Sequence, residues 1–187
     1  MRIVSHSVSA DLQNLLTEYT NLANKFREKS PQFINDVEAW LLKAEAVFKK
    51  HNFPDTSKFG RLSSAVSATR RGYLLGEKNR NPRGEKQFLC WQFLNDGQDV
   101  VHLYLLKEVD KLEKAESLLS QLIVIAFQKK ILDSEFLKGN KGNETAQTWQ
   151  KLAQEQDFSS GVLQLKLMIS QIDILILLDK INDKLKD

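Results

Sequence analysis

Cysteine, proline and glycine are all scarce in this chain of 187 residues, which has one cysteine, three prolines and eight glycines. Cys90 has no second cysteine to pair with, so a secreted fold held by internal disulfides is excluded, and we expect a reducing, intracellular and cytoplasmic setting. With few glycines and prolines the chain has few tight turns. This disfavours a β fold of many short strands and favours long helices.

Apolar runs of membrane-spanning length are also absent. The most apolar stretch, 162–178, contains Lys166 and Asp173, and both would be costly in lipid. We therefore expect no membrane partner. The apolar fraction of 42% and charged fraction of 27% are ordinary for a globular protein, and a chain of this length can bury a core without metals or disulfides.

Apolar residues recur at steps of three and four along most of the chain, a pattern that predicts amphipathic helices. We expect a first helix capped by Ser9, a second over 31–51 and a third over 55–73. A long helix over 98–132 and a last helix over 160–185 complete the main elements.

These elements predict an all-α fold, an irregular bundle of five to seven helices with 98–132 and 160–185 as two long central helices. The simplest organisation is a single helical domain over 1–187. The alternative is a subdivision into a main bundle over 1–138 and a C-terminal helical hairpin over 144–187.

Two segments before the long helix need separate interpretation. The aromatic-rich 88–94 segment is predicted to be helical, with a hairpin that pairs 73–75 with 88–93 left open as the alternative. The run Asn95-Asp96-Gly97 predicts a break between this segment and the long helix.

The last helix has a polar side in the helical projection. Lys166, Ser170, Asp173 and Lys180 fall together at 100° per residue, so we expect all four to face solvent.

Positive charge is concentrated in one part of the chain. Five of the seven arginines lie between Arg61 and Arg83, and the segment 58–86 has eight basic residues against Glu77 and Glu85. The segment therefore carries +6, whereas the whole chain carries +3. Clustered arginine is what proteins use to recognise phosphate and carboxylate groups.

Helical phase separates the residues of this basic segment. Arg70 lies at the border of the apolar stripe and is expected either to extend its charged end to solvent or to pair with a carboxylate, while the outward arc of the third helix holds only arginines and small residues. The predicted binding residues are those of this arc and of the loop after it: Arg61, Ser64, Ser67, Arg71, Lys78, Arg80, Arg83 and Lys86.

Such a surface suits nucleic acid, RNA or DNA, or a ribonucleoprotein, because arginine and serine side chains are common phosphate contacts. Four aromatic residues nearby could stack on unpaired bases: Tyr73, Phe88, Trp91 and Phe93. The alternative is a helical adaptor or scaffold subunit that binds an acidic protein partner through the same residues. The 98–132 helix is also a candidate surface for self-association.

No catalytic, cofactor or metal motif is visible. The chain has no HExxH, no CxxC, no phosphate-binding glycine loop and no strand-linked GxGxxG. Cys90 is predicted to be a small core residue, and His102 a packed or half-exposed helix residue. A small hydrolase or nuclease without a recognisable motif, using His102 as acid or base, is the weaker alternative to a binding protein.

Overall fold

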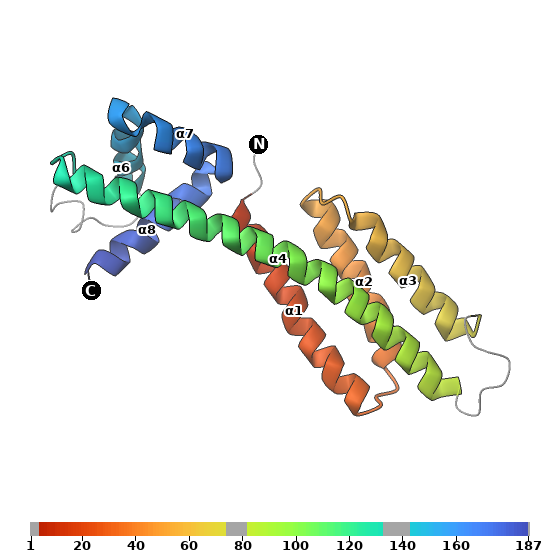
Figure 1. The fold of residues 1–187 in the computed structure, drawn as a ribbon. Helices are drawn as coiled ribbons and strands as arrows, with labels where there is room; N and C mark the ends of the chain where they lie inside the picture. The colour runs from red at the N-terminus through yellow and green to blue at the C-terminus, as the bar shows by residue number, and fades with distance from the viewer. Residues whose placement is uncertain (1–3, 74–81, 133–142, 187) are drawn as a thin grey trace. The chain divides into compact units, whose positions relative to one another are not determined.

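The protein is all-α in the computed structural model, which describes residues 4–73, 82–132 and 143–186. These residues contain seven α-helices, a short 3-10 helix and no strand, which confirms the predicted fold class. In chain order they are α1 (Ser5–Arg27), α2 (Phe33–Lys50), α3 (Thr56–Arg71), α4 (Pro82–Gln128), α6 (Asn143–Gln154), η1 (Gln156–Phe158), α7 (Ser159–Met168) and α8 (Gln171–Lys186) (Figure 1).

The chain forms two compact units. The bundle unit is Val8–Leu106, and the C-terminal unit is Lys107–Asp187 together with Met1–Ser7. The boundary falls within α4, whereas the sequence suggested a subdivision between 138 and 144. The expectation of a single domain over 1–187 stays a prediction.

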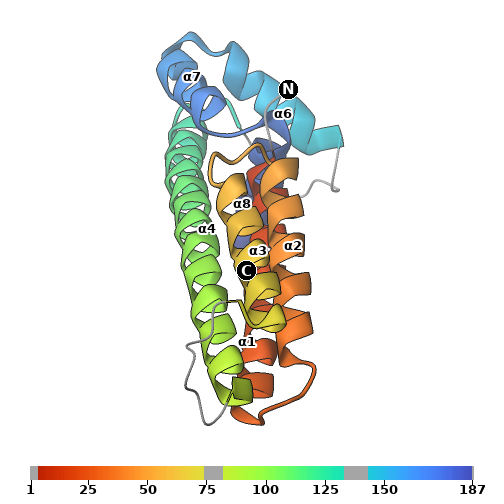
Figure 2. The same cartoon turned by 90° about the vertical axis from the view of Figure 1, so that its right-hand side faces the viewer.

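The bundle unit consists of α1 from Val8 onward, α2, α3 and the first part of α4, which lie side by side (Figure 2). α2 shows why these segments are helical: Phe33, Val37, Trp40, Ala44 and Phe48 recur on one side and are all buried. The indole Nε1 of Trp40 donates a hydrogen bond to the backbone oxygen of Leu15 at 2.9 Å, which ties α2 to α1.

The predicted break at Asn95-Asp96-Gly97 is wrong, because α4 runs without interruption from Pro82 to Gln128. The 88–94 segment lies within this helix, so the helical prediction is confirmed and the hairpin is not formed. Gly97 serves close packing instead. A Cβ added there would lie 3.0 Å from Leu41 Cδ2 and 3.0 Å from Trp40 Cζ3, both in buried side chains of α2.

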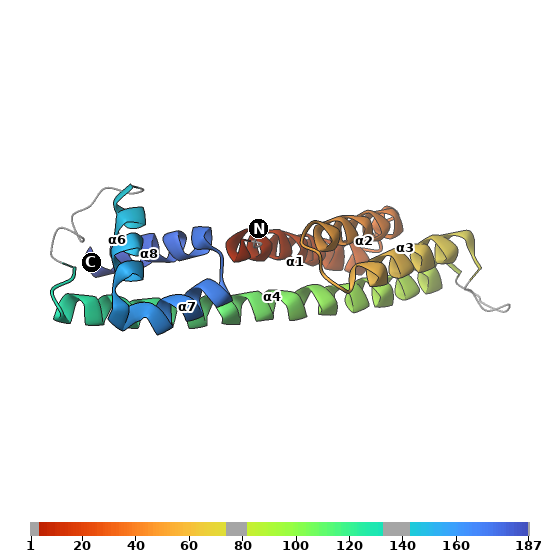
Figure 3. The same ribbon diagram turned by 90° about the horizontal axis from the view of Figure 1, so that it is seen from above.

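The C-terminal unit packs α6, α7 and α8 around the later part of α4 (Figure 3). Its core includes Leu119 and Ile123 from α4, Leu152 from α6, Leu165 from α7 and Leu178 from α8. α7 meets α4 where Gly161 lies over Leu122, because a Cβ on Gly161 would lie 2.9 Å from Leu122 Cδ2.

The expected last helix over 160–185 is two helices. Ile169 is extended, with φ −131° and ψ 169°, and the segments on either side of it are bent by 115°. Ser170 and Asp173 start α8 as a capping box: the amide of Asp173 donates to Ser170 Oγ at 3.2 Å, and the amide of Ser170 donates to Asp173 Oδ2 at 3.2 Å. This local alternative to helix continuation accounts for the break.

Asp173 also holds the beginning of α1. Its carboxylate accepts the backbone amides of Ser5 at 2.9 Å and His6 at 3.0 Å, and it lies 2.8 Å from His6 Nδ1. The helix therefore begins at Ser5, and the predicted cap by Ser9 is wrong. Asp173 is fully buried and Ser170 nearly so, which also corrects their expected solvent exposure. A carboxylate at a helix N-terminus is favoured by the helix dipole.

The hydrogen bonds to Asp173 determine its titration. Burial by itself would raise the pKa of Asp173, but the hydrogen bonds from Ser170, His6 and Ser5 outweigh it and lower the pKa below its ordinary value of 3.8. The folded state thus favours the ionised carboxylate. Its contribution to stability is complete above the ordinary pKa and is lost as the pH falls through the lowered value.

Replacing Asp173 with asparagine is expected to reduce the free energy of unfolding at pH 7 by roughly 2–4 kcal/mol, because charge-assisted hydrogen bonds are lost. The difference between wild type and variant should shrink as the pH falls below the ordinary pKa of 3.8 and through the lowered pKa of folded Asp173. Urea unfolding followed by circular dichroism measures both quantities. Asp96→Asn, at an exposed position on α4, is the control. A pH-independent difference would contradict the assignment.

Gly97→Ala is expected to lower stability by about 1 kcal/mol, since crowding against α2 exceeds the gain in helix propensity. Gly60→Ala is a matched control in α3, because its Cβ would meet the carboxylate end of Glu45 at 3.2 Å, which can move aside. This control should be neutral or stabilising. Equal effects of the two substitutions on the melting temperature would show that Gly97 is not a packing glycine.

Candidate nucleic-acid interface

The predicted binding residues of α3 lie mostly on its exposed side. Arg61, Ser64 and Arg71 are exposed, and Ser67 is half-buried. Ser64 Oγ donates to the backbone oxygen of Gly60 at 2.8 Å within its own helix. Arg61 and Arg71 make no ion pair or side-chain hydrogen bond with any residue in the described part of the chain. Their guanidinium groups are therefore available to a ligand.

The remaining predicted residues fall into two groups. Arg83 and Lys86 lie in α4 rather than in the loop that the sequence suggested: Arg83 is exposed in the first turn, and Lys86 is half-buried one turn later. Lys86 Nζ donates to the backbone oxygen of Arg70 at 2.8 Å, so it satisfies a carbonyl at the end of α3. Lys78 and Arg80 lie outside the described residues.

Arg70 has the structural role expected from its phase. It forms an ion pair with Glu38 at 2.8 Å and a hydrogen bond with Asn35 Oδ1 at 3.2 Å, both on α2. Of the two expectations for Arg70, pairing with a carboxylate is the one that the structure confirms.

The fold adds two cations that the sequence analysis missed. α1 and α3 end where α4 begins, because consecutive helices of the bundle unit run in opposite directions (Figures 1 and 2). Gln87 Nε2 donates to the backbone oxygen of Ser30 at 3.0 Å, which places the α1–α2 turn against the start of α4. Arg27 and Lys29, both exposed, are thereby brought to the same end of the unit.

We call this group the basic end: Arg27, Lys29, Arg71, Arg83 and Lys86. Two acids of the surrounding segments, Glu28 and Glu85, offset part of its charge. Two others are already occupied, since Asp36 pairs with Lys25 at 2.7 Å and Glu38 pairs with Arg70. A net excess of positive charge remains. Amphipathic periodicity with alternating helix direction is the signal that could have found Arg27 and Lys29.

Helix dipoles explain why some of these cations lie at helix ends, but they do not explain the position of every one. Arg27 and Arg71 are the last residues of α1 and α3, where a cation is favourable. Arg83 lies in the first turn of α4, where the dipole disfavours positive charge. Stability alone therefore does not account for the arginine at this position.

The four aromatic residues near the basic segment divide into two pairs. Trp91 stacks on Phe26 at 4.7 Å and on Tyr19 at 5.9 Å between ring centroids, and Phe93 packs against the core. Tyr73 is 77% exposed and Phe88 is 54% exposed. Only the second pair is available to a ligand. The predicted third helix over 55–73 includes Tyr73, but α3 ends at Arg71, and Gly72 turns the chain with φ 90°.

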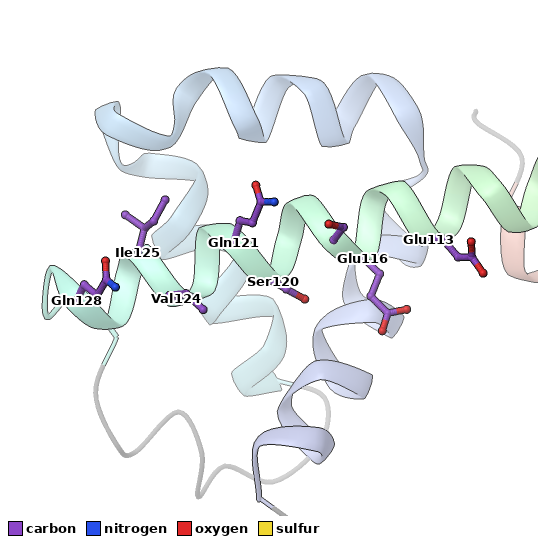
Figure 4. A pocket seen from close by; sticks show the side chains of 8 residues that line it. Glu113, Glu116, Ser120, Gln121, Val124, Ile125 and Gln128 are labelled. Carbon is purple, nitrogen blue, oxygen red and sulfur yellow. The ribbon is translucent and has the colours of Figure 1, made fainter.

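A second surface feature lies in the C-terminal unit. An open groove of about 780 Å³ follows α4, and its lining includes Glu113, Ser120, Val124 and Gln128 (Figure 4). Another lining residue, Glu116, has its carboxylate held by Lys180 and Lys184 of α8. The groove holds none of the predicted binding residues. Self-association through the 98–132 helix would use this kind of exposed face, and it stays a prediction.

The groups that could support catalysis are mostly occupied or isolated. His6 is held by Asp173, and His51 Nε2 lies 2.7 Å from Asp11 Oδ2. His102 is exposed and has no hydrogen-bonding partner in the described ranges. Within those same ranges no group of three or more histidine, cysteine or acidic residues could hold a metal ion.

Comparison with known proteins gives no family for the chain: no family model, no curated protein and no solved structure matches it. Of the described helices, none is by itself both long and apolar enough to cross a membrane. One bent pair, Gln156–Met168 with Gln171–Leu185, meets the length and composition test.

Cys90 is a core residue, as expected. Its side chain is fully buried, and burial raises the pKa of the Cys90 thiol to about 11. At pH 8 we expect the native protein to react with a chromogenic disulfide reagent only slowly, through opening of the fold. In denaturant, one thiol per chain should react at the rate of a free cysteine. A fast reaction of the native protein would show that Cys90 is exposed.

Proposed function

We propose that the protein is a non-catalytic nucleic-acid-binding protein whose basic end contacts the phosphate backbone of RNA or DNA. The observation that carries this proposal is the gathering, at one end of the bundle unit, of cations from three separate segments that pair with none of the described residues. Arg27 comes from α1, Arg71 from α3 and Arg83 from α4. Lys29 in the α1–α2 turn adds a fourth.

The chemistry of the basic end matches a phosphate ligand. Arginine guanidinium groups bind phosphate oxygens through two parallel hydrogen bonds, and several of them around one surface can follow a backbone. Arg83 near the N-terminus of α4 supports an anionic ligand in particular, because the helix dipole and the arginine then act on the same charge. The reducing, intracellular setting suggested by the single cysteine fits a nucleic-acid partner.

The residues predicted from the sequence to bind phosphate are not equivalent in the folded protein. Arg71 and Arg83 are primary contacts, together with Arg27, and Lys86 is a supporting residue because it already binds the end of α3. Arg61 lies ten residues before Arg71, about 15 Å along α3, so it would extend the surface rather than form its centre. Ser64 and Ser67 lie between them.

The test is charge reversal at three positions, Arg27→Glu, Arg71→Glu and Arg83→Glu in one variant. At about 100 mM salt the affinity for a labelled oligonucleotide should fall at least 30-fold. The slope of log K against log salt should drop by about three, because each lost phosphate contact removes about one unit. Fluorescence anisotropy measures the binding, and circular dichroism checks that the helices remain.

The matched control reverses three exposed lysines away from the basic end, Lys49, Lys151 and Lys166, so the net charge changes equally. This control should keep at least half of the wild-type affinity. Equal losses in both variants would mean that only net charge matters and would contradict a defined interface. Unchanged binding by the arginine variant would do the same. Wild-type binding to an acidic protein but to no nucleic acid would favour the adaptor alternative instead.

A further inference from the structure

Two large aromatic side chains, each two residues from a member of the basic end, are exposed, although phenylalanine and tyrosine normally bury most of their surface. Tyr73 is 77% exposed and Phe88 is 54% exposed. Phosphate binding by arginine and lysine does not need either ring. Their exposed faces are available to stack on a second part of the ligand, one with an apolar, planar face.

The backbone of Tyr73 is held by hydrogen bonds, although its side chain is largely exposed. Gly72 adopts φ 90°, its amide donates to Thr69 O at 3.0 Å, and the amide of Tyr73 donates to Ala68 O at 3.0 Å. This is a Schellman motif, in which the residue after the glycine often packs back on the helix. The ring of Tyr73 remains largely in solvent instead, two residues after Arg71.

Phe88 is held on the second turn of α4. Its neighbour Gln87 is buried and binds Ser30 O, while Lys86 binds Arg70 O at the end of α3. Phe88 follows Lys86 by two residues, or 200° around the helix, so it lies on the side of α4 turned away from the end of α3. Tyr73 thus follows Arg71 at the end of α3, and Phe88 lies on another side of α4 than Lys86.

We propose that the basic end binds single-stranded nucleic acid, with Tyr73 and Phe88 stacking on unpaired bases while the arginines contact the phosphates. Duplex bases are stacked on one another and do not present their faces, whereas single strands do. Both rings stand on ordered backbone, so little conformational entropy is lost when a base stacks on them. This inference rests on the proposed function, because the arginines supply the backbone contacts.

The test compares labelled single strands of about ten nucleotides, one RNA and one DNA, with a DNA duplex of the same sequence at one salt concentration. Wild-type protein should bind the single strands more tightly than the duplex. Tyr73→Ala and Phe88→Ala should each weaken single-strand binding about tenfold, within the range for loss of one stacked base. Duplex binding should change less than twofold.

Conservative variants separate stacking from a structural role. Tyr73→Phe and Phe88→Trp keep an aromatic face and should keep single-strand affinity within about threefold of wild type. Leu42→Ala removes an apolar side chain that is 53% exposed on α2 and should leave all three affinities unchanged. Separate RNA and DNA strands show which sugar the site accepts.

The outcomes distinguish this inference from the proposed function. If wild type binds duplex and single strands equally and both alanine variants bind as wild type does, the stacking inference is overturned while backbone binding stands. If wild type binds neither form, both proposals fail. A loss that the conservative variants share would show that the rings act through folding and would also overturn stacking.

Discussion

The long helix α4 carries apolar side chains along most of its 47 residues, and these must be buried. The other helices are arranged so that they cover these side chains. Its first part contributes Cys90, Leu94 and Val101 to the core of the bundle unit. Its later part contributes Leu119 and Ile123 to the core of the C-terminal unit. An isolated helix of this length would expose all of these side chains, so each part needs its own set of packed helices. Gly97 belongs to the same requirement, because α2 lies too close to α4 there for a larger side chain.

Packing against α4 also creates the candidate site. Consecutive helices of the bundle unit alternate in direction, so the ends of α1 and α3 meet the beginning of α4. The hydrogen bonds from Lys86 to Arg70 and from Gln87 to Ser30 hold these ends together. The basic end is thus assembled from segments that are far apart in the sequence. Ordered helix ends are suitable places for such residues, since their positions are set by the core rather than by a mobile loop.

The parts of the fold that could be predicted from the sequence are those determined by short-range patterns. Apolar spacing was sufficient to predict the helices around Trp40 and Phe59, and the lone Cys90 was correctly expected in the core. The same patterns failed where a local signal has two meanings. A glycine such as Gly97 can indicate either a helix break or a close contact between helices. The close approach of α2 shows that Gly97 serves the contact. Ser170 and Asp173 read as a polar side of one helix, although their spacing of three also matches a capping box.

By itself, the sequence determined the helical class, the amphipathic face of each segment and the concentration of arginine between Arg61 and Arg83. These properties depend on composition and on spacings of a few residues, which backbone geometry converts directly into faces of helices. Only the tertiary structure decided which arginines are engaged within the bundle unit and which lie at the same end of it. Arg70 pairs with Glu38, whereas Arg71 and Arg83 pair with no residue that the structure describes and lie at the same end of the bundle unit as Arg27. That choice depends on contacts between helices distant in the chain, and no local periodicity contains that information.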